Sequence, residues 1–294
     1  MKYLVVTFGK GLLRLTRRYL KGSRPSSYPY ISGDSFRKIA DHVYDETKQA
    51  IDVQRMRPGD TVFVPTHFVP QFFDTVHPYI HTTYKLITHN SDNAVDEELV
   101  KYIDSRILRW YAQNNSVAHP LIVPIPIGLE NFHHCENGIV NRFNRLRRQK
   151  ARQQKLSRAL VCFAVHTNRI EREVAYRVLM SNGYCDEIRP RLNNNEYLQH
   201  LIHYKFVVAP PGNGLDTHRV WEAMYLGVVP IVKRSVAMSS FETLGLPLWV
   251  IDDWRELETI NDDGLDRKWQ ELHGHFDAPM LFMDYWVQRI RENF

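Results

Sequence analysis

Cysteine is scarce in this sequence, with three residues among 294. Cys135, Cys162 and Cys185 are too few and too scattered for a disulfide framework or a cysteine-rich zinc site. Cys162 lies in an apolar, strand-like run, where cysteine behaves as a small core residue. The cysteine content therefore indicates a reducing compartment, and we expect a cytoplasmic protein.

Long hydrophobic runs are also lacking. No apolar run approaches the roughly 18 residues that cross a bilayer, so we expect no transmembrane segment. The amino-terminal MKYLVVTFGKG has a short apolar run but no small-residue cleavage site. We interpret it as the first core strand rather than a signal peptide, and we expect a soluble chain without a membrane anchor.

Metal-binding patterns are lacking as well, although the chain has 14 histidines. The histidine pairs lie at 133/134, 200/203 and 273/275. None of these pairs joins a third ligand at a recognised spacing. Scattered surface or core histidines explain them, and we expect no metal site.

Positive charge is in modest excess, with a net charge of +5 and a pI of about 9.0. The excess is concentrated at residues 10–24 and 142–158. Aromatic side chains that stack on bases are almost absent from the second segment. We therefore interpret the second segment as a solvated helix face. The first segment places its leucines near one helical face, so an ordinary amphipathic helix explains it, and we expect no nucleic-acid partner.

Apolar runs and helical spacing alternate along the chain. Strand-like runs occur at 3–8, 61–65, 84–88, 121–128, 159–165, 206–210, 228–232 and 247–251. Helical spacing occurs at 34–54, 95–113, 170–182, 194–204, 216–226, 253–259 and 264–294. Strands that are apolar on both faces and alternate with helices predict an α/β fold with parallel sheets.

The basic segment at 142–158 divides this series into two similar halves. We therefore expect two Rossmann-like domains, at 1–145 and 146–275, with a central cleft between them. A last helix at 276–294 is expected to pack back on the first domain. Ligands of such sheets bind beyond the carboxyl ends of the strands.

The glycines of TFGKG, after the first predicted strand, suggest a dinucleotide fingerprint at first sight. Arg14 occupies the place of the third glycine, however, and a lone G-x-G is most often a tight turn. An NAD-dependent oxidoreductase is therefore the third and weakest of the alternative functions that the sequence suggests.

The stretch FVVAPPGNGLDTHRVWEAMYLGVVPIV, at 206–232, is the most informative part of the sequence. Gly212, Asn213 and Gly214 follow an apolar strand and precede a helix, where backbone N–H groups and the helix dipole favour an anion. Asp216 or Thr217 is expected to cap that helix.

Three polar side chains lie in the first turns of the same helix. His218 and Arg219 lie beside the expected phosphate, and Glu222 is one turn further on the same face, where its carboxylate can accept two hydrogen bonds from a ribose diol. A surface ion pair of Arg219 with Glu222 is the alternative. The pattern favours a cradle for a nucleotide diphosphate.

These residues resemble a known family. PPGNGLDTHRVWEAMYLGVVPIV resembles the donor-binding signature of exostosin-like glycosyltransferases (glycosyltransferase family 47), and WYAQNNSVAHPLIVPIPIGLEN, LITHNSD and ISGDSFR resemble segments of its first domain. The resemblance implies a GT-B fold and an inverting hexosyl- or pentosyltransferase. The donor is expected to be a UDP-sugar, such as UDP-xylose, UDP-galactose or UDP-glucuronate, and the acceptor a glycan.

The resemblance also implies roles for single residues. Gly212, Asn213, Gly214, His218 and Arg219 are expected to hold the diphosphate, Glu222 the ribose, and Asn168 and Arg172 the phosphate from the neighbouring strand end. The chain contains no D-x-D motif, so arginine and the helix dipole are expected to replace a metal, and we expect no cofactor.

An inverting enzyme needs one general base, expected in the first half. Candidates at strand or loop ends are Asp92, Asp34, His89, His67 and Glu130, with Asp92 and Asp34 leading and His89 third. Both aspartates also suit a helix cap. Alternatives for the whole chain are a GDP-sugar-dependent, fucosyltransferase-like enzyme and a non-catalytic protein that binds sugar nucleotides or glycans.

Overall fold

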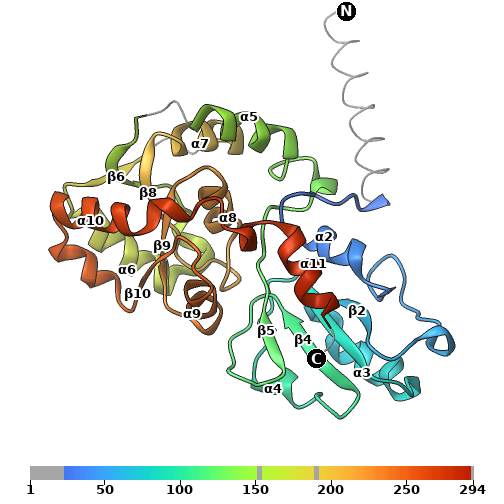
Figure 1. The fold of residues 1–294 in the computed structure, drawn as a ribbon. Helices are drawn as coiled ribbons and strands as arrows, with labels where there is room; N and C mark the ends of the chain where they lie inside the picture. Colours follow the sequence, from blue (N-terminus) through green and yellow to red (C-terminus); the bar gives the residue numbers. More distant parts are fainter. Residues whose placement is uncertain (1–22, 151–153, 189–191, 293–294) are drawn as a thin grey trace, which may run out of the picture.

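The fold consists of two parallel sheets, one in each half of the chain (Figure 1). The structure is a computed structural model that describes residues 23–150, 154–188 and 192–292. Within this part, the sheets have five strands each, in the orders β1-β2-β3-β4-β5 and β10-β9-β8-β6-β7. The predicted α/β fold class with two parallel sheets is confirmed. The predicted strand at 3–8 and the TFGKG glycines lie outside the described residues.

The first half contains the elements α2 (Gly33–Ile39), β1 (His42–Val43), β2 (Asp60–Pro65), α3 (Val69–Thr75), β3 (Tyr84–His89), α4 (Glu97–Val100), β4 (Ile107–Ala112) and β5 (Ile122–Pro124). Successive residues of each strand point to opposite faces of the sheet. Val64 and Trp110 therefore pack with Phe72 of α3, whereas Phe63 and Tyr111 pack with Phe36 of α2 on the other face.

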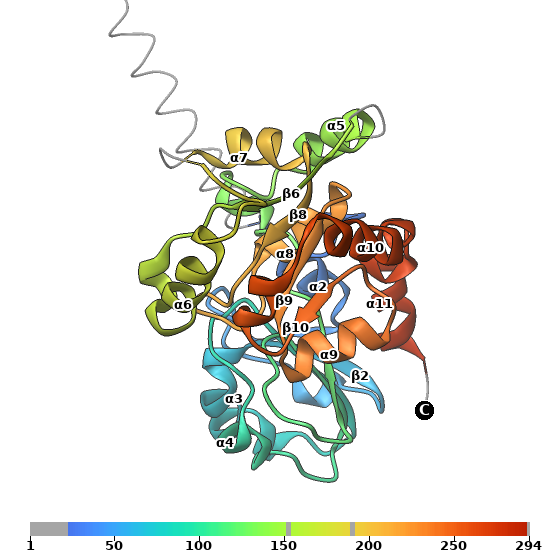
Figure 2. The same cartoon turned by 90° about the vertical axis from the view of Figure 1, so that its left-hand side faces the viewer.

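The second half contains α5 (Val140–Lys150), β6 (Leu156–Val161), α6 (Arg169–Met180), β7 (Cys185–Glu187), α7 (Asn194–Leu201), β8 (Tyr204–Val208), α8 (His218–Tyr225), β9 (Val229–Lys233), α9 (Val236–Thr243), β10 (Trp249–Ile251) and α10 (Asp262–Leu272). Val208 packs with residues of α6 and α10, and Val207 packs with residues of α7, α8 and α9. In Figure 2 this half lies above the first half.

The final helix, α11 (Met283–Arg291), lies against the first sheet (Figure 1). The Lys85 ammonium donates to the Ile290 carbonyl at 2.7 Å, and the Tyr111 hydroxyl donates to the Arg289 carbonyl at 3.1 Å. Trp286 is fully buried in the same apolar cluster as Tyr111. The apolar side of α11 thus packs against β3 and β4. The domain division at 145 and 275 stays a prediction.

Several predicted helices are wrong in extent. The helix expected at 95–113 is the short α4 followed by the central strand β4, because ILRWYA is rich in β-branched and aromatic side chains that suit a buried strand. The helix expected at 34–54 ends at Ile39, and the one expected at 264–294 is broken between α10 and α11. The segment 253–259 is a 3₁₀ helix at 254–259.

Candidate functional site

A cavity of about 710 Å³ lies where the carboxyl ends of the two sheets meet, and residues of both halves line it. This volume is within the range of sites for small molecules and cofactors. Of the predicted donor-binding residues, the lining includes Arg172, Gly212, Asn213 and Gly214 before α8, and His218, Arg219 and Glu222 on α8. The structure therefore brings seven residues of that set together.

Asn168, the remaining residue of that set, is not part of the lining. It is the N-cap of α6, where its side-chain oxygen accepts from the Glu171 N–H at 3.4 Å. Its side-chain amide donates to the Gly212 carbonyl at 3.2 Å. Asn168 therefore contacts the glycine turn without lining the cavity.

The glycine turn lies tightly against two polar side chains. A Cβ atom at Gly212 would lie 2.9 Å from Nη2 of Arg172, and one at Gly214 would lie 2.5 Å from Nδ2 of Asn114. The Gly212 N–H donates to the Gly214 carbonyl at 3.0 Å, which closes the turn. Only glycine lets this backbone pass so close to its neighbours.

Arg172 is buried beneath this turn and connects it to the end of β6. Its Nε donates to the Pro211 carbonyl at 2.8 Å, and its Nη1 donates to the Ala164 carbonyl at 2.8 Å. Burial, together with the charge of Arg219, lowers the pKa of Arg172 to about 10. The acceptors of Arg172 are neutral, so its positive charge remains uncompensated at the cavity.

Arg219 is held in the first turn of α8 by the Cys162 carbonyl, which accepts from its Nη2 at 2.6 Å. Its guanidinium carbon lies 5.6 Å from the ring centre of Tyr197. Among the described residues, neither Arg172 nor Arg219 forms an ion pair with a carboxylate. Two arginines near enough to repel each other thus share one cavity.

The amino end of α8 has no side-chain cap. Thr217 occupies the N-cap position but makes no capping hydrogen bond, and the Asp216 carboxylate accepts instead from the Ile127 N–H and from Nε1 of Trp221. The predicted capping by Asp216 or Thr217 is therefore wrong. Gly227, which follows the helix, has the left-handed backbone conformation typical of a helix end, with φ of 68°.

Glu222 is 5% exposed and lines the cavity one turn after Arg219. Its Oε1 accepts from Nδ2 of Asn194 at 3.0 Å, and no ion pair joins it to Arg219. Burial raises the pKa of the Glu222 carboxyl, against the opposing influence of His218. The alternative of a surface ion pair between Arg219 and Glu222 does not fit this arrangement.

His218 connects the two halves of the chain. Its Nδ1 lies 2.8 Å from the Gly128 carbonyl, which requires a proton on that nitrogen. The N–H of Asp216 likewise donates to Oδ1 of Asn114 at 2.9 Å. The loop before α8 is thus bound to segments that follow β4 and β5.

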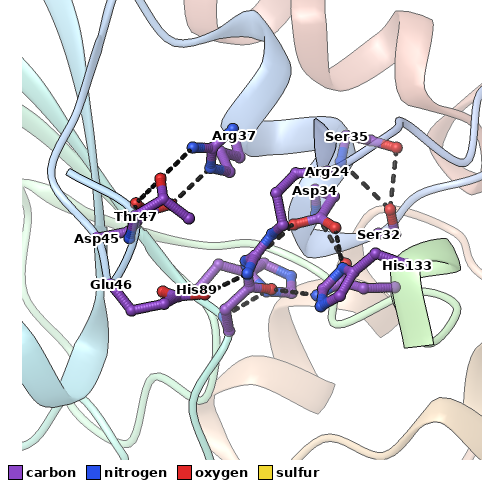
Figure 3. A network of polar contacts seen from close by, with 12 residues as sticks. Arg24, Ser32, Asp34, Ser35, Arg37, Asp45, Glu46, Thr47, His89 and His133 are labelled. Carbon is purple, nitrogen blue, oxygen red and sulfur yellow. Dashed lines mark hydrogen bonds and ion pairs between the residues drawn. The ribbon is translucent and has the colours of Figure 1, made fainter. Parts of the chain in front are cut away.

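Two of the predicted catalytic residues lie outside the cavity lining. Asp34 is fully buried, and its carboxylate lies 2.9 Å from Nε of Arg24 and 2.5 Å from Nδ1 of His133 (Figure 3). Burial opposes ionisation of Asp34, but its contacts with His133 and Arg24 outweigh it and hold the pKa low. Ser32, rather than Asp34, caps α2.

His89 is 2% exposed, and its Nε2 lies 3.0 Å from the Pro126 carbonyl. Burial lowers its pKa to about 4, so the ring is neutral at pH 7. The Asn90 side chain joins His89 to Asp34, since its oxygen lies 3.2 Å from Nδ1 of His89 and its nitrogen 3.4 Å from Asp34. These contacts tie the end of β3 to the start of α2.

Asp92 is the predicted catalytic residue that lines the cavity, and it is exposed there. Asp96 caps α4, so the alternative of Asp92 as a cap is wrong. Glu130 lines the cavity too, with its two carboxylate oxygens each 3.0 Å from a nitrogen of Asn137. Asp92 and Glu130 thus both face the cavity from the first half.

Helix α7 contributes residues that sequence reasoning missed. Asn194 and Tyr197 lie three residues apart on α7 and face Glu222 and Arg219, which are three residues apart on α8. Which face of α7 meets α8 depends on how the two helices pack, and no local pattern reports that.

Within the described ranges, no three histidine, cysteine, aspartate or glutamate side chains come together as a metal site. In the same residues, no helix combines the length and apolar character that a bilayer crossing requires.

Comparison with known proteins gives a likeness in structure alone. No family model matches the chain, and no curated protein is similar to it in sequence. The α,α-trehalose 6-phosphate synthase of Burkholderia multivorans is 10% identical, with a TM-score of 0.45, over 81% of this chain and 71% of that one.

A second similar structure is the UDP-forming α,α-trehalose-phosphate synthase of Burkholderia vietnamiensis. It is 11% identical, with a TM-score of 0.44, over 80% of this chain and 73% of that one. Likeness at this level carries no conclusion about activity. The resemblance to exostosin-like glycosyltransferases therefore stays a prediction.

Proposed function

We propose that this chain is an inverting glycosyltransferase that moves a sugar from a nucleotide sugar to a glycan hydroxyl. One observation carries the proposal: Arg172 and Arg219, neither of which forms an ion pair with a carboxylate of the described residues, meet at a glycine turn and an uncapped helix start, on the wall of one cavity. Buried charge of one sign needs a counter-charge. A diphosphate supplies it, and the amino end of α8 favours the same anion.

The position of Glu222 favours a nucleoside diphosphate over a free phosphate as the ligand of the cavity. It lies one helical turn from Arg219, and Asn194 holds one of its oxygens. A carboxylate in this position accepts hydrogen bonds from the two hydroxyls of a ribose. From the resemblance to exostosin-like enzymes we propose a UDP-sugar as the donor and no obligatory metal, with a GDP-sugar as the alternative that the experiment below distinguishes.

The reaction is a single displacement at the anomeric carbon. The acceptor hydroxyl loses its proton to a carboxylate, its oxygen forms the new bond to the anomeric carbon, and the bond from that carbon to the diphosphate breaks. Arg219 and the dipole of α8 stabilise the charge on the leaving diphosphate. We propose Asp92 as the base, because it lines the cavity from the half that lies across from Arg219. Glu130 is the second candidate, because Asn137 fixes its orientation.

Release of nucleoside diphosphate from a panel of UDP- and GDP-sugars, with and without glycan acceptors, tests the proposal. We expect turnover of one nucleotide class and a loss of about 100-fold or more in Asp92→Asn, in which general base catalysis is removed. The neighbouring exposed Glu97→Gln is the matched control and retains full activity. If Glu130→Gln alone loses activity, the base is Glu130; absence of turnover with every donor contradicts the proposal.

A further inference from the structure

Residues that line the cavity carry buried hydrogen-bonding atoms that the protein itself leaves without a partner. In the described part of the chain, seven buried side-chain atoms have no hydrogen-bond partner, and three of them belong to residues of this one lining. These are the Tyr197 hydroxyl, Nε of Arg219 and the Thr217 hydroxyl. Buried polar groups are almost always paired, so their concentration in one cavity indicates a missing ligand.

Tyr197 is the most constrained of the three. It is 6% exposed, lies on α7 in the cavity lining, and its ring centre lies 5.6 Å from the guanidinium carbon of Arg219. Burial raises the pKa of its phenol, against the opposing influence of Arg219, so the group keeps its proton at neutral pH. Tyr197 is thus a fixed hydroxyl that can donate a hydrogen bond.

The surroundings identify the chemistry of the group that accepts from it. An N–H of Arg219 can only donate, and the hydroxyls of Tyr197 and Thr217 can each donate as well. Arg172 adds a second positive charge that Arg219 already repels. A group with several acceptor oxygens and negative charge satisfies all of them, and a phosphate is such a group.

We propose that Tyr197 is a phosphate-binding residue: its hydroxyl, with Nε of Arg219 and the Thr217 hydroxyl, donates to the oxygens of one phosphate of the bound nucleotide. This assignment rests on the proposed donor site and adds α7 to it. It gives the Tyr197–Arg219 and Asn194–Glu222 contacts separate tasks, since the first serves the phosphate and the second the ribose.

Tyr197→Phe tests the assignment, because it removes the hydroxyl and keeps the ring beneath Arg219. Titration calorimetry with UDP, GDP and inorganic pyrophosphate measures the affinity, and thermal unfolding without ligand measures the stability. We expect the affinity for the diphosphates to fall about 10-fold or more, because this change corresponds to the loss of one hydrogen bond to a charged group. The melting temperature without ligand should stay or rise, because an unpaired buried hydroxyl disappears.

Tyr184→Phe is the matched control. The Tyr184 hydroxyl is buried outside the cavity and donates to the Leu257 carbonyl at 2.6 Å. Its loss should lower the melting temperature and leave diphosphate affinity unchanged. If Tyr197→Phe behaves like this control, or binds diphosphates as the wild type does, the hydroxyl serves the protein fold and the inference is overturned.

Pyrophosphate separates this inference from the proposed function. Wild-type protein that binds pyrophosphate through Tyr197, but turns over no nucleotide sugar, contradicts the glycosyltransferase and supports the phosphate site. Turnover of a nucleotide sugar with unchanged affinity in Tyr197→Phe supports the enzyme and rejects the role of Tyr197. Wild-type protein that binds neither nucleotide nor pyrophosphate overturns both.

Discussion

The Asp216 carboxylate, in the second half of the chain, accepts a hydrogen bond of 2.8 Å from the backbone N–H of Ile127, in the first half. The indole of Trp221 donates to the same carboxylate at 2.9 Å. Asp216 is 2% exposed, and burial raises its pKa to about 6 although both donors favour the ionised form. A titratable group thus lies at the contact between the two halves, directly before the proposed phosphate site.

This contact predicts a pH dependence of stability. Between about pH 4 and pH 6, the folded protein holds a proton on Asp216 that the unfolded chain, with a pKa of 3.8, releases. Wild type should therefore gain up to about 3 kcal/mol of unfolding free energy relative to Asp216→Asn as the pH falls from 7 to 4. Urea denaturation of both proteins at several pH values measures this, and a constant difference between them would show that Asp216 has an ordinary pKa.

Asp34 is predicted to matter for stability. Asp34→Asn leaves Arg24 and His133 buried without their carboxylate, which costs about 3–5 kcal/mol of unfolding free energy. Asp92→Asn, at an exposed position, should change the unfolding free energy by less than about 0.5 kcal/mol. Equal stability of the two variants at pH 7 would mean that the network in Figure 3 does not hold α2 and β3 together.

Position 214 is predicted to require glycine, because it has no room for a side chain. In Gly214→Ala the new Cβ meets Nδ2 of Asn114 at 2.5 Å, which pushes the glycine turn away from the first half. We expect a loss of about 1–3 kcal/mol in stability and weaker nucleotide binding, as in other overpacked sites. Gly183→Ala is the control, since nothing lies within 4 Å of its Cβ. Thermal unfolding in which both variants match wild type would contradict the tight contact.

Glu222 is predicted to recognise the ribose. In Glu222→Gln the amide carbonyl replaces the oxygen that accepts from Asn194, so an N–H group faces the ligand. Wild type should bind UDP about 10-fold more tightly than 2′-deoxy-UDP, and the variant should bind the two about equally. A preference for UDP that survives in Glu222→Gln would place the ribose elsewhere.

The fold was predictable where strands are buried on both faces. β2, β8 and β9 contain the continuous apolar runs VFVP, FVV and VPIV, and their positions follow from that pattern. The strand β4 was not predictable in this way. Arg109 interrupts ILRWYA, and the apolar residues of 95–106 continue their helical spacing into it. Pairing of β4 between β3 and β5 decides its conformation, and pairing is not a local property.

The donor side of the site was predictable for a related reason. Arg219 and Glu222 share one helix face through local geometry alone, and the glycine turn precedes them in sequence. Asp34 was misplaced because its partner His133 is 99 residues away, so no local pattern reports the ion pair. Tyr197 escaped notice on the same ground, since its role depends on the packing of α7 against α8.

The central claim is that Arg219 binds the diphosphate of a nucleotide, and direct titration of UDP and GDP tests it. Wild type should bind at least one of them, and Arg219→Met should weaken that binding by about 10-fold or more. Arg177→Met is the control, because Arg177 is an exposed arginine paired with Glu173 and lies outside the cavity lining. Wild-type protein that binds neither nucleotide at millimolar concentration, or Arg219→Met that binds as wild type does, would contradict the account.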